Sequence, residues 1–168
     1  MKKINNKTIV TIALLAALHV ILSRFFSINA WNLKIGFAFL PVFIAAYLYG
    51  PLVAGAVGAI GDFVGALMVP IGQYFPGLTF SCFLTGIVFG MLLYKKQSTL
   101  RILAAVTADQ LIISLLINSY WISLISGAPY VPLLAARGVQ CLIMAPVMFI
   151  TMTAGVRILK RVKKTAYC

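Results

Sequence analysis

The sequence predicts an all-α, polytopic membrane protein: a bundle of six transmembrane helices with both termini in the cytoplasm. Three observations support this fold class. Of the 168 residues, 62% are hydrophobic and only 10% are charged, whereas about 25% of the residues of a soluble domain are charged. The mean hydropathy is +1.06. The apolar residues form long continuous runs and not short alternating segments, which favours membrane helices over a β-barrel.

Turn residues between the apolar runs place the helices. The chain is interrupted at Gly50–Pro51, between Pro70 and Gly77, and again at Gly127–Pro129. Since one span needs about 20 residues, six spans use about 120 positions and leave only short loops. We therefore expect one membrane domain over residues 1–168. The expected helices cover about residues 8–22, 35–49, 51–69, 78–94, 100–124 and 132–159.

The basic residues predict the orientation, because cytoplasmic loops are enriched in Lys and Arg. The net charge is +12, from 14 basic and two acidic residues. Arg24 and Lys34 lie on one side of the predicted bundle, and Arg137 lies inside the last helix. All the others lie on the opposite, cytoplasmic side: Lys2, Lys3, Lys7, Lys95, Lys96, Arg101, Arg157, Lys160, Arg161, Lys163 and Lys164. Because these charges flank membrane spans, they do not indicate a nucleic-acid partner.

Asp62 is a carboxylate inside a predicted span, where an unpaired charge is costly. At 100° per residue it falls within a stripe of small residues, so it faces protein and not lipid. Two interpretations stay open, a ligand-binding residue and a structural carboxylate that holds neighbouring helices together. The stripe consists of Ala54, Gly55, Gly58, Gly61, Gly65 and Ala66.

The predicted helix over residues 100–124 carries a polar stripe that must line the interior or a cavity. Its members are Thr107, Gln110, Ser114, Asn118 and Trp121. Asp109 lies off this stripe, and we interpret it as a structural or partner-interface residue, with a role in the site as the less favoured alternative. His19, the single histidine, is interpreted as structural.

Arg137 and Gln140 share one face of the last helix, at i and i+3. Arg137 either extends to the outer headgroups or points with Gln140 into a cavity, and the shared face favours the cavity. Together with Asp62, Asn118 and Ser81, these residues converge on the outer half of the bundle. The outer loops add the cations Arg24 and Lys34. They also add aromatic rings that either form interfacial belts or stack on a planar ligand, among them Trp31, Tyr74, Phe75 and Trp121.

Several chemistries have no matching pattern. The sequence contains no G-x-x-x-x-G-K-[ST] segment for ATP, no H-E-x-x-H and no G-x-S-x-G. Cys82, Cys141 and Cys168 form no C-x-x-C pair, so no metal or haem cofactor is predicted. We expect a protein that is not an enzyme.

Residues 23–90 resemble the substrate-binding S component of energy-coupling-factor (ECF) vitamin transporters, and within that family the folate-specific branch. The resemblance is carried by Ser23–Ile28, Lys34–Pro41, Tyr49–Pro51, Gly61–Gly65 and Pro70–Thr79, and it continues in Asn118–Trp121 and Arg137. The segment Gly72–Gln73–Tyr74–Phe75–Pro76–Gly77–Leu78–Thr79 is the most specific part. Tyr49 departs mildly from the Phe expected there.

The resemblance implies a six-helix bundle in a prokaryotic cell membrane that binds folate or a related pterin near its outer side. It implies docking on a transmembrane T component driven by two cytoplasmic ATPases, with Ala13 and Ala17 as the matching interface positions. Ordinary helix packing is the alternative for that pair. Asp62 would accept hydrogen bonds from the pterin edge. Arg24, Lys34 or Arg137 would pair with the glutamate carboxylates.

Three alternatives remain at this stage. One is an S component for another vitamin, such as thiamine or riboflavin, although a site lined by cations disfavours cationic thiamine. The second is a small channel or membrane assembly protein. The third, an intramembrane enzyme, lacks a catalytic constellation.

Overall fold

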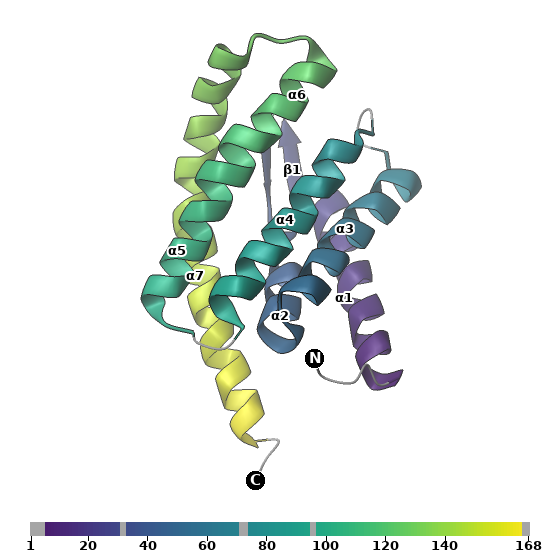
Figure 1. The fold of residues 1–168 in the computed structure, drawn as a ribbon, viewed down its shortest axis with the longest axis vertical. Helices are drawn as coiled ribbons and strands as arrows, with labels where there is room; N and C mark the ends of the chain where they lie inside the picture. The colour runs from purple at the N-terminus through teal and green to yellow at the C-terminus, as the bar shows by residue number, and fades with distance from the viewer. Residues whose placement is uncertain (1–5, 31–32, 71–73, 95–96, 166–168) are drawn as a thin grey trace.

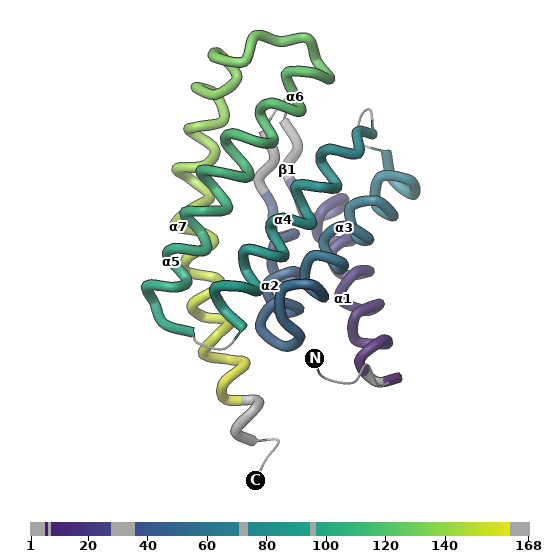
Figure 2. Tube along the Cα trace, viewed as in Figure 1, coloured from purple at the N-terminus to yellow at the C-terminus, as the bar shows by residue number. Residues whose placement is uncertain are grey.

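The computed structural model describes residues 6–30, 33–70, 74–94 and 97–165. Almost all of these residues are helical (Figure 1). The elements in chain order are α1 (Asn6–Arg24), β1 (Ser27–Ala30), β2 (Leu33–Gly36), α2 (Phe39–Tyr49), α3 (Pro51–Met68), α4 (Pro76–Leu93), α5 (Thr99–Ala108), the π-helix η1 (Asp109–Ile117), α6 (Asn118–Ser126) and α7 (Tyr130–Thr165). Helices α5, η1 and α6 follow one uninterrupted path (Figure 2).

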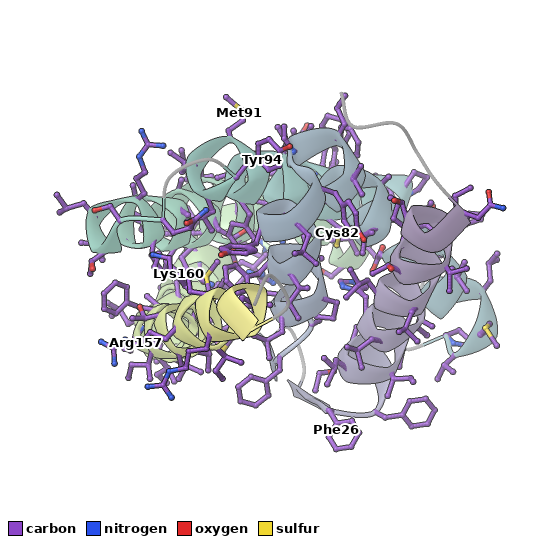
Figure 3. The ribbon with its side chains drawn as sticks, turned by 90° about the horizontal axis from the view of Figure 1, so that it is seen from below. Phe26, Cys82, Met91, Tyr94, Arg157 and Lys160 are labelled. Atoms are coloured by element: carbon purple, nitrogen blue, oxygen red, sulfur yellow. The ribbon has the colours of Figure 1, made fainter. Side chains whose placement is uncertain are left out.

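The composition of the helices confirms the prediction of an apolar helical protein. Four helical stretches of the described chain are long and apolar enough to cross a membrane: Pro51–Met68, Pro76–Leu93, Thr99–Ser126 and Tyr130–Arg161. Thr8–Arg24 and Phe39–Tyr49 are shorter apolar helices. Large apolar side chains also face outward, and the labelled Phe26 and Met91 project from opposite sides of the bundle (Figure 3). Such a surface suits lipid and not water.

A β-hairpin replaces the start of one predicted helix. Strands β1 and β2 pair antiparallel with Ser27 opposite Gly36. The prediction of a helix from about residue 35 is therefore wrong at its start, since α2 begins at Phe39. Gly36 allows the close pairing, because a Cβ there would lie 2.6 Å from the Cβ of Ser27. The backbone groups that a helix would satisfy locally are satisfied across the hairpin.

The small-residue stripe on α3 is buried, as predicted: Ala54, Gly55, Gly58, Gly61 and Gly65 all face the interior. Helix α4 packs closely on this stripe. A Cβ on Gly58 would lie 2.6 Å from the carbonyl oxygen of Cys82, so the two backbones approach as only glycine permits. This contact brings the second half of α3 and the first half of α4 together around Asp62.

The apolar core lies toward the lower end of the bundle in Figure 1, around α2. Phe43, Phe89 and Met152 are fully buried there. The same end holds the beginning of α1, the end of α4, the beginning of α5 and the last turns of α7, which extend beyond the other helices (Figure 1). Arg157 and Lys160 lie on these turns of α7 (Figure 3).

Candidate functional site

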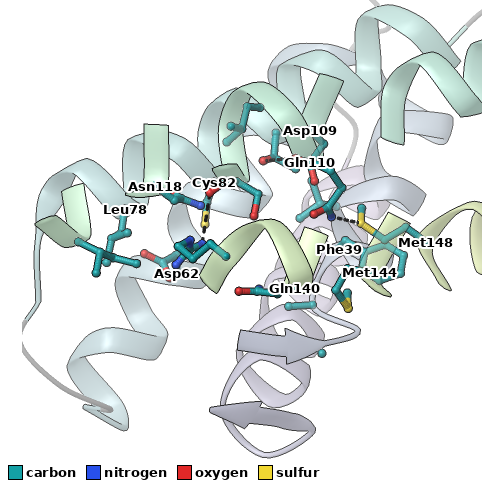
Figure 4. A pocket seen from close by; sticks show the side chains of 18 of the residues that line it. Phe39, Asp62, Leu78, Cys82, Asp109, Gln110, Asn118, Gln140, Met144 and Met148 are labelled. Atoms are coloured by element: carbon teal, nitrogen blue, oxygen red, sulfur yellow. Dashed lines mark hydrogen bonds between the residues drawn. The ribbon is translucent and has the colours of Figure 1, made fainter. Parts of the chain in front are cut away.

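A cavity of about 420 Å³ lies between α2, α3, α4, η1, α6 and α7. Its volume falls within the range of small-molecule binding sites. Apolar side chains form much of its wall, and a few polar groups point into it (Figure 4). The main polar groups are Asp62, Asp109, Gln110, Asn118, Arg137 and Gln140. This combination of an apolar wall with a few fixed polar groups is typical of a site for an organic ligand.

The structure brings together four of the residues that the sequence singles out. Asp62 comes from α3, Asn118 from the start of α6, and Arg137 and Gln140 from α7, and all four line the cavity. Arg137 is 4% exposed, and its Nη2 donates a hydrogen bond to the carbonyl oxygen of Ser114 at 3.3 Å. The guanidinium therefore points into the bundle and does not extend to the headgroups.

Asp62 has partners from two other helices. Its Oδ1 lies 3.8 Å from Nη2 of Arg24, and its Oδ2 accepts a hydrogen bond from Thr79 at 2.8 Å. Gly65 makes room for the cation, because a Cβ there would lie 2.9 Å from Nε of Arg24. The carboxylate thus ties α1, α3 and α4 together, which supports its structural interpretation.

Arg24 is not the loop cation that the sequence predicts. It is the last residue of α1, it is largely buried, and its guanidinium is engaged by Asp62. It does not line the cavity. The prediction placed the end of this helix at residue 22, two residues too early, and so assigned Arg24 to a loop.

The predicted residues Tyr74, Phe75, Ser81 and Trp121 do not line the cavity either. The Ser81 hydroxyl is buried and donates to the carbonyl oxygen of Gly77 at 3.1 Å. Serine side chains within helices often bond to the carbonyl four residues earlier in this way. Phe75 packs against Trp121 with ring centroids 5.5 Å apart. The Tyr74 hydroxyl lies 3.4 Å from Oγ1 of Thr79, whose single proton is donated to Asp62. Phe75 and Trp121 thus pack on each other, and the ring of Tyr74 packs on Phe63 of α3 with centroids 5.9 Å apart.

Two predicted ligand residues fall outside this description. Trp31 lies outside the described residues. The backbone of Lys34 belongs to β2, but its side chain lies outside the described part of the structure.

Asp109 is the cavity residue that sequence reasoning missed. It is 7% exposed, it lines the cavity, and its Oδ1 accepts a hydrogen bond from Thr85 of α4 at 2.7 Å. Its burial excludes the partner-interface interpretation. At 100° per residue, the α-helical period predicts a position off the polar stripe for Asp109.

The π-helix explains the error. A π-helix bonds each N–H to the carbonyl five residues earlier, so each residue advances by a smaller angle than in an α-helix. The backbone N–H of Asn118 donates to the carbonyl of Ile113 in this manner. Asp109, Gln110, Ser114 and Asn118 consequently all reach the cavity, while Thr107, which the α-helical stripe included, is exposed. The signal that could have identified Asp109 is its carboxylate within a predicted membrane span, where a charged group usually has a functional role.

The inner wall of the cavity is apolar and adaptable. Phe39, Val42, Met144 and Met148 line it beside Gln110. His19 also lines the cavity, with its Nδ1 2.9 Å from the carbonyl oxygen of Ala38. Within the described ranges, no group of three or more His, Cys, Asp or Glu side chains is placed to hold a metal ion.

An apolar helical bundle that encloses such a pocket defines a class of protein, the membrane-embedded proteins that bind small organic molecules. Comparison with known families narrows the class. Residues 3–159 match the family model described as "ECF-type riboflavin transporter, S component". The chain therefore belongs to the S components of ECF-type transporters, which are transporter components and not enzymes. The family resemblance of the sequence is confirmed.

Relatives within the family carry a more specific description. The chain is 34% identical over 164 residues to the folate transporter FolT of Clostridium novyi (strain NT), covering 97% of this chain and 94% of the relative. It is 30% identical over 152 residues to the folate transporter FolT of Leuconostoc mesenteroides subsp. mesenteroides, covering 86% and 82%. It also matches the crystal structure of FolT bound with folic acid, with a TM-score of 0.84 and 32% identity over 89% of this chain and 92% of that one.

Proposed function

We propose that this chain is the folate-binding S component of an ECF-type vitamin uptake transporter. The observation that carries the proposal is the cavity, where a buried arginine, two carboxylates and several amides project into an apolar pocket. The relatives described as folate transporters and the folic acid-bound structure of the same fold support it.

The chemistry of folate suits this pocket. Folate joins a flat pterin ring, which carries adjacent N–H donors, to a glutamate with two carboxylates. Carboxylate and amide oxygens accept from such donors, and the guanidinium of Arg137 is suited to a carboxylate. Asn118 and Gln140 complete the polar lining with groups that both donate and accept.

Riboflavin is the second candidate, because the matching family model is described by that vitamin. Riboflavin lacks carboxylates, whereas Arg137 brings a buried positive charge to the cavity wall. A guanidinium matches a carboxylate in both charge and geometry. Arg137 therefore favours an anionic ligand.

The topology that we propose has six spans in one domain, with both termini cytoplasmic, in a prokaryotic cell membrane. Helices α1 and α2 would add two spans to the four long ones, with α5, η1 and α6 counted as one. Of the described basic residues, Arg101, Arg157 and Lys160 belong to the end of the bundle where α5 begins and α7 finishes. Their clustering supports a cytoplasmic assignment for this end.

Partner subunits complete the proposal. The S component would dock on a transmembrane T component, with ATP hydrolysed by two cytoplasmic ATPases. Ala13 and Ala17 are both exposed on α1, one helical turn apart. Small exposed residues at this spacing suit the close approach of a partner helix.

Ligand identification tests the proposal. Mass spectrometry of the protein purified from cells should detect a co-purified folate. Calorimetry on ligand-free protein should show tight binding of folate and little heat with riboflavin or thiamine. Tight binding of riboflavin with no binding of folate would reject the proposal. The protein alone in liposomes should give no ion flux, whereas a channel would give one.

A further inference from the structure

One end of the cavity, which we call the inner end, lies beside Phe39, Met144 and Met148 and presents a pair of neighbouring acceptor groups. Asp109 and Gln110 are the first two residues of η1, both line the cavity, and they are 7% and 6% exposed. Thr85 donates to Oδ1 of Asp109. No described residue donates to the other carboxylate oxygen, Oδ2, so this oxygen retains its full capacity to accept.

Gln110 is held so that its carbonyl is the unsatisfied group. Its amide nitrogen donates to Sδ of Met148. Its Oε1 is buried and accepts no hydrogen bond within the described part of the chain. A buried acceptor without a donor raises the free energy of the protein. A ligand that supplies the donor removes this penalty.

The walls beside the two acceptors suit a flat ring. Phe39, Met144 and Met148 line the same end of the cavity (Figure 4). Thioether and aromatic side chains both pack favourably on aromatic rings. A planar heterocycle in this place would lie between apolar side chains and turn its edge toward η1.

The outer carboxylate is less suited to the same role. The Oδ2 atom of Asp62 accepts from the Thr79 hydroxyl, and its Oδ1 lies 3.8 Å from the Arg24 guanidinium, an ion pair longer than a hydrogen bond. A carboxylate beside a cation is a weaker acceptor for further donors than one whose partner is a single neutral hydroxyl.

We propose that Asp109 and Gln110 form an inner subsite that selects the ligand by the adjacent N–H donors on the edge of its heterocycle. For a pterin these donors are the ring N3–H and the 2-amino group. The inference rests on the proposed function and assigns the ring edge to Asp109 and not to Asp62. It also gives the π-helix a role, since an α-helical backbone would turn Asp109 away from the cavity.

A comparison of two ligands tests the subsite on the unaltered protein. Pterin-6-carboxylate and lumazine-6-carboxylate differ at position 2, where an amino donor is replaced by a carbonyl acceptor. Each is titrated against bound folate with the full chain in nanodiscs. We expect the pterin to compete at least about 10-fold better, because the lumazine carbonyl would face the two acceptors. Equal competition would overturn the subsite while leaving folate binding intact.

A variant locates the effect at Asp109. In Asp109→Asn, the amide carbonyl can still accept from Thr85, and its NH₂ group then faces the ligand's own donors. We expect a loss of folate affinity of about 10- to 100-fold, together with a smaller preference for the pterin over the lumazine. Thr107→Ala, on the exposed face of α5, is the matched control and should change neither quantity.

The outcomes separate the two proposals. If the unaltered protein does not bind folate, the proposed function and the subsite both fail. If it binds folate and Asp109→Asn retains affinity and preference, only the subsite fails. If the variant does not fold, the ligand comparison on the unaltered protein decides.

Discussion

The two acidic residues of this chain, Asp62 and Asp109, both lie inside helices and both line the cavity, yet their surroundings differ. Asp62 lies on a glycine-lined α-helix between a cation and a hydroxyl. Asp109 lies on a π-helix, and its one hydrogen-bond donor among the described residues is the Thr85 hydroxyl. The carboxylate of Asp62 is thus paired with a cation of the protein, whereas that of Asp109 has a neutral partner and keeps an oxygen for a ligand. Position within a bundle therefore does not assign a role to a buried carboxylate, but its partners do.

Arg137 gives the largest expected effect, because it is the buried cation of the cavity wall. Replacing it by Gln should weaken folate binding by at least about 30-fold, the loss expected when one partner of a buried charge pair is removed. Calorimetry on the purified protein measures the change. Pteroate, which lacks the glutamate, should show a much smaller loss if Arg137 pairs with the tail, and an equal loss would place Arg137 elsewhere on the ligand.

Arg24 should affect stability more than specificity. Arg24→Ala removes the cation from a largely buried carboxylate, and we expect a loss of roughly 2 kcal/mol in the free energy of unfolding. Because the two groups interact directly, the double variant Arg24→Ala/Asp62→Asn should lose less stability than the sum of the losses in the two single variants. Thermal unfolding in detergent gives the comparison. Additive losses would mean that the pair at 3.8 Å contributes no stability.

The two threonines that serve the carboxylates offer a matched pair. Thr85→Val removes the partner of Asp109, and Thr79→Val removes a partner of Asp62. We expect Thr85→Val to lower folate affinity by several-fold. The hydrogen bond from Thr85 orients the ligand-binding carboxylate, and its loss costs about 1.5 kcal/mol. Thr79→Val should leave affinity nearly unchanged, because Arg24 still holds Asp62. The reverse ranking would contradict the assignment of the ring edge to Asp109.

Gly65 tests the packing around the outer pair with the smallest expected effect. In Gly65→Ala the new Cβ would lie 2.9 Å from Nε of Arg24, so the guanidinium must shift, at a cost of about 1 kcal/mol in stability. Gly138→Ala is the control on α7, since nothing lies within 4 Å of its Cβ position. The control should be neutral or slightly stabilising, because alanine favours a helix. Equal behaviour of the two variants would indicate that Arg24 adapts without loss.

Sequence reasoning succeeds where a local pattern decides the outcome. The α3 glycine stripe, and the facing of Arg137 and Gln140 into the bundle, follow from α-helical periodicity. It fails where that periodicity is interrupted or where a distant segment supplies a partner. Asp109 and residues 35–38 are failures of the first kind. The aromatic pair Phe75 and Trp121 is of the second kind, since the two rings come from distant segments and pack on each other. Ser81 belongs to neither kind, because its hydroxyl bonds to the carbonyl of Gly77 in the same helix.

Hydropathy and small-residue spacing are properties of each segment alone, so the apolar surroundings of this protein and the pattern of its helices can be predicted from the sequence. Which of the two carboxylates keeps an oxygen for a ligand depends on the folded arrangement. A π-helical register depends on hydrogen bonds five residues apart and on what packs beside them. The pairing of Arg24 with Asp62 depends on two helices meeting. Neither the π-helical register nor this pairing can be predicted from the periodicity of a single segment.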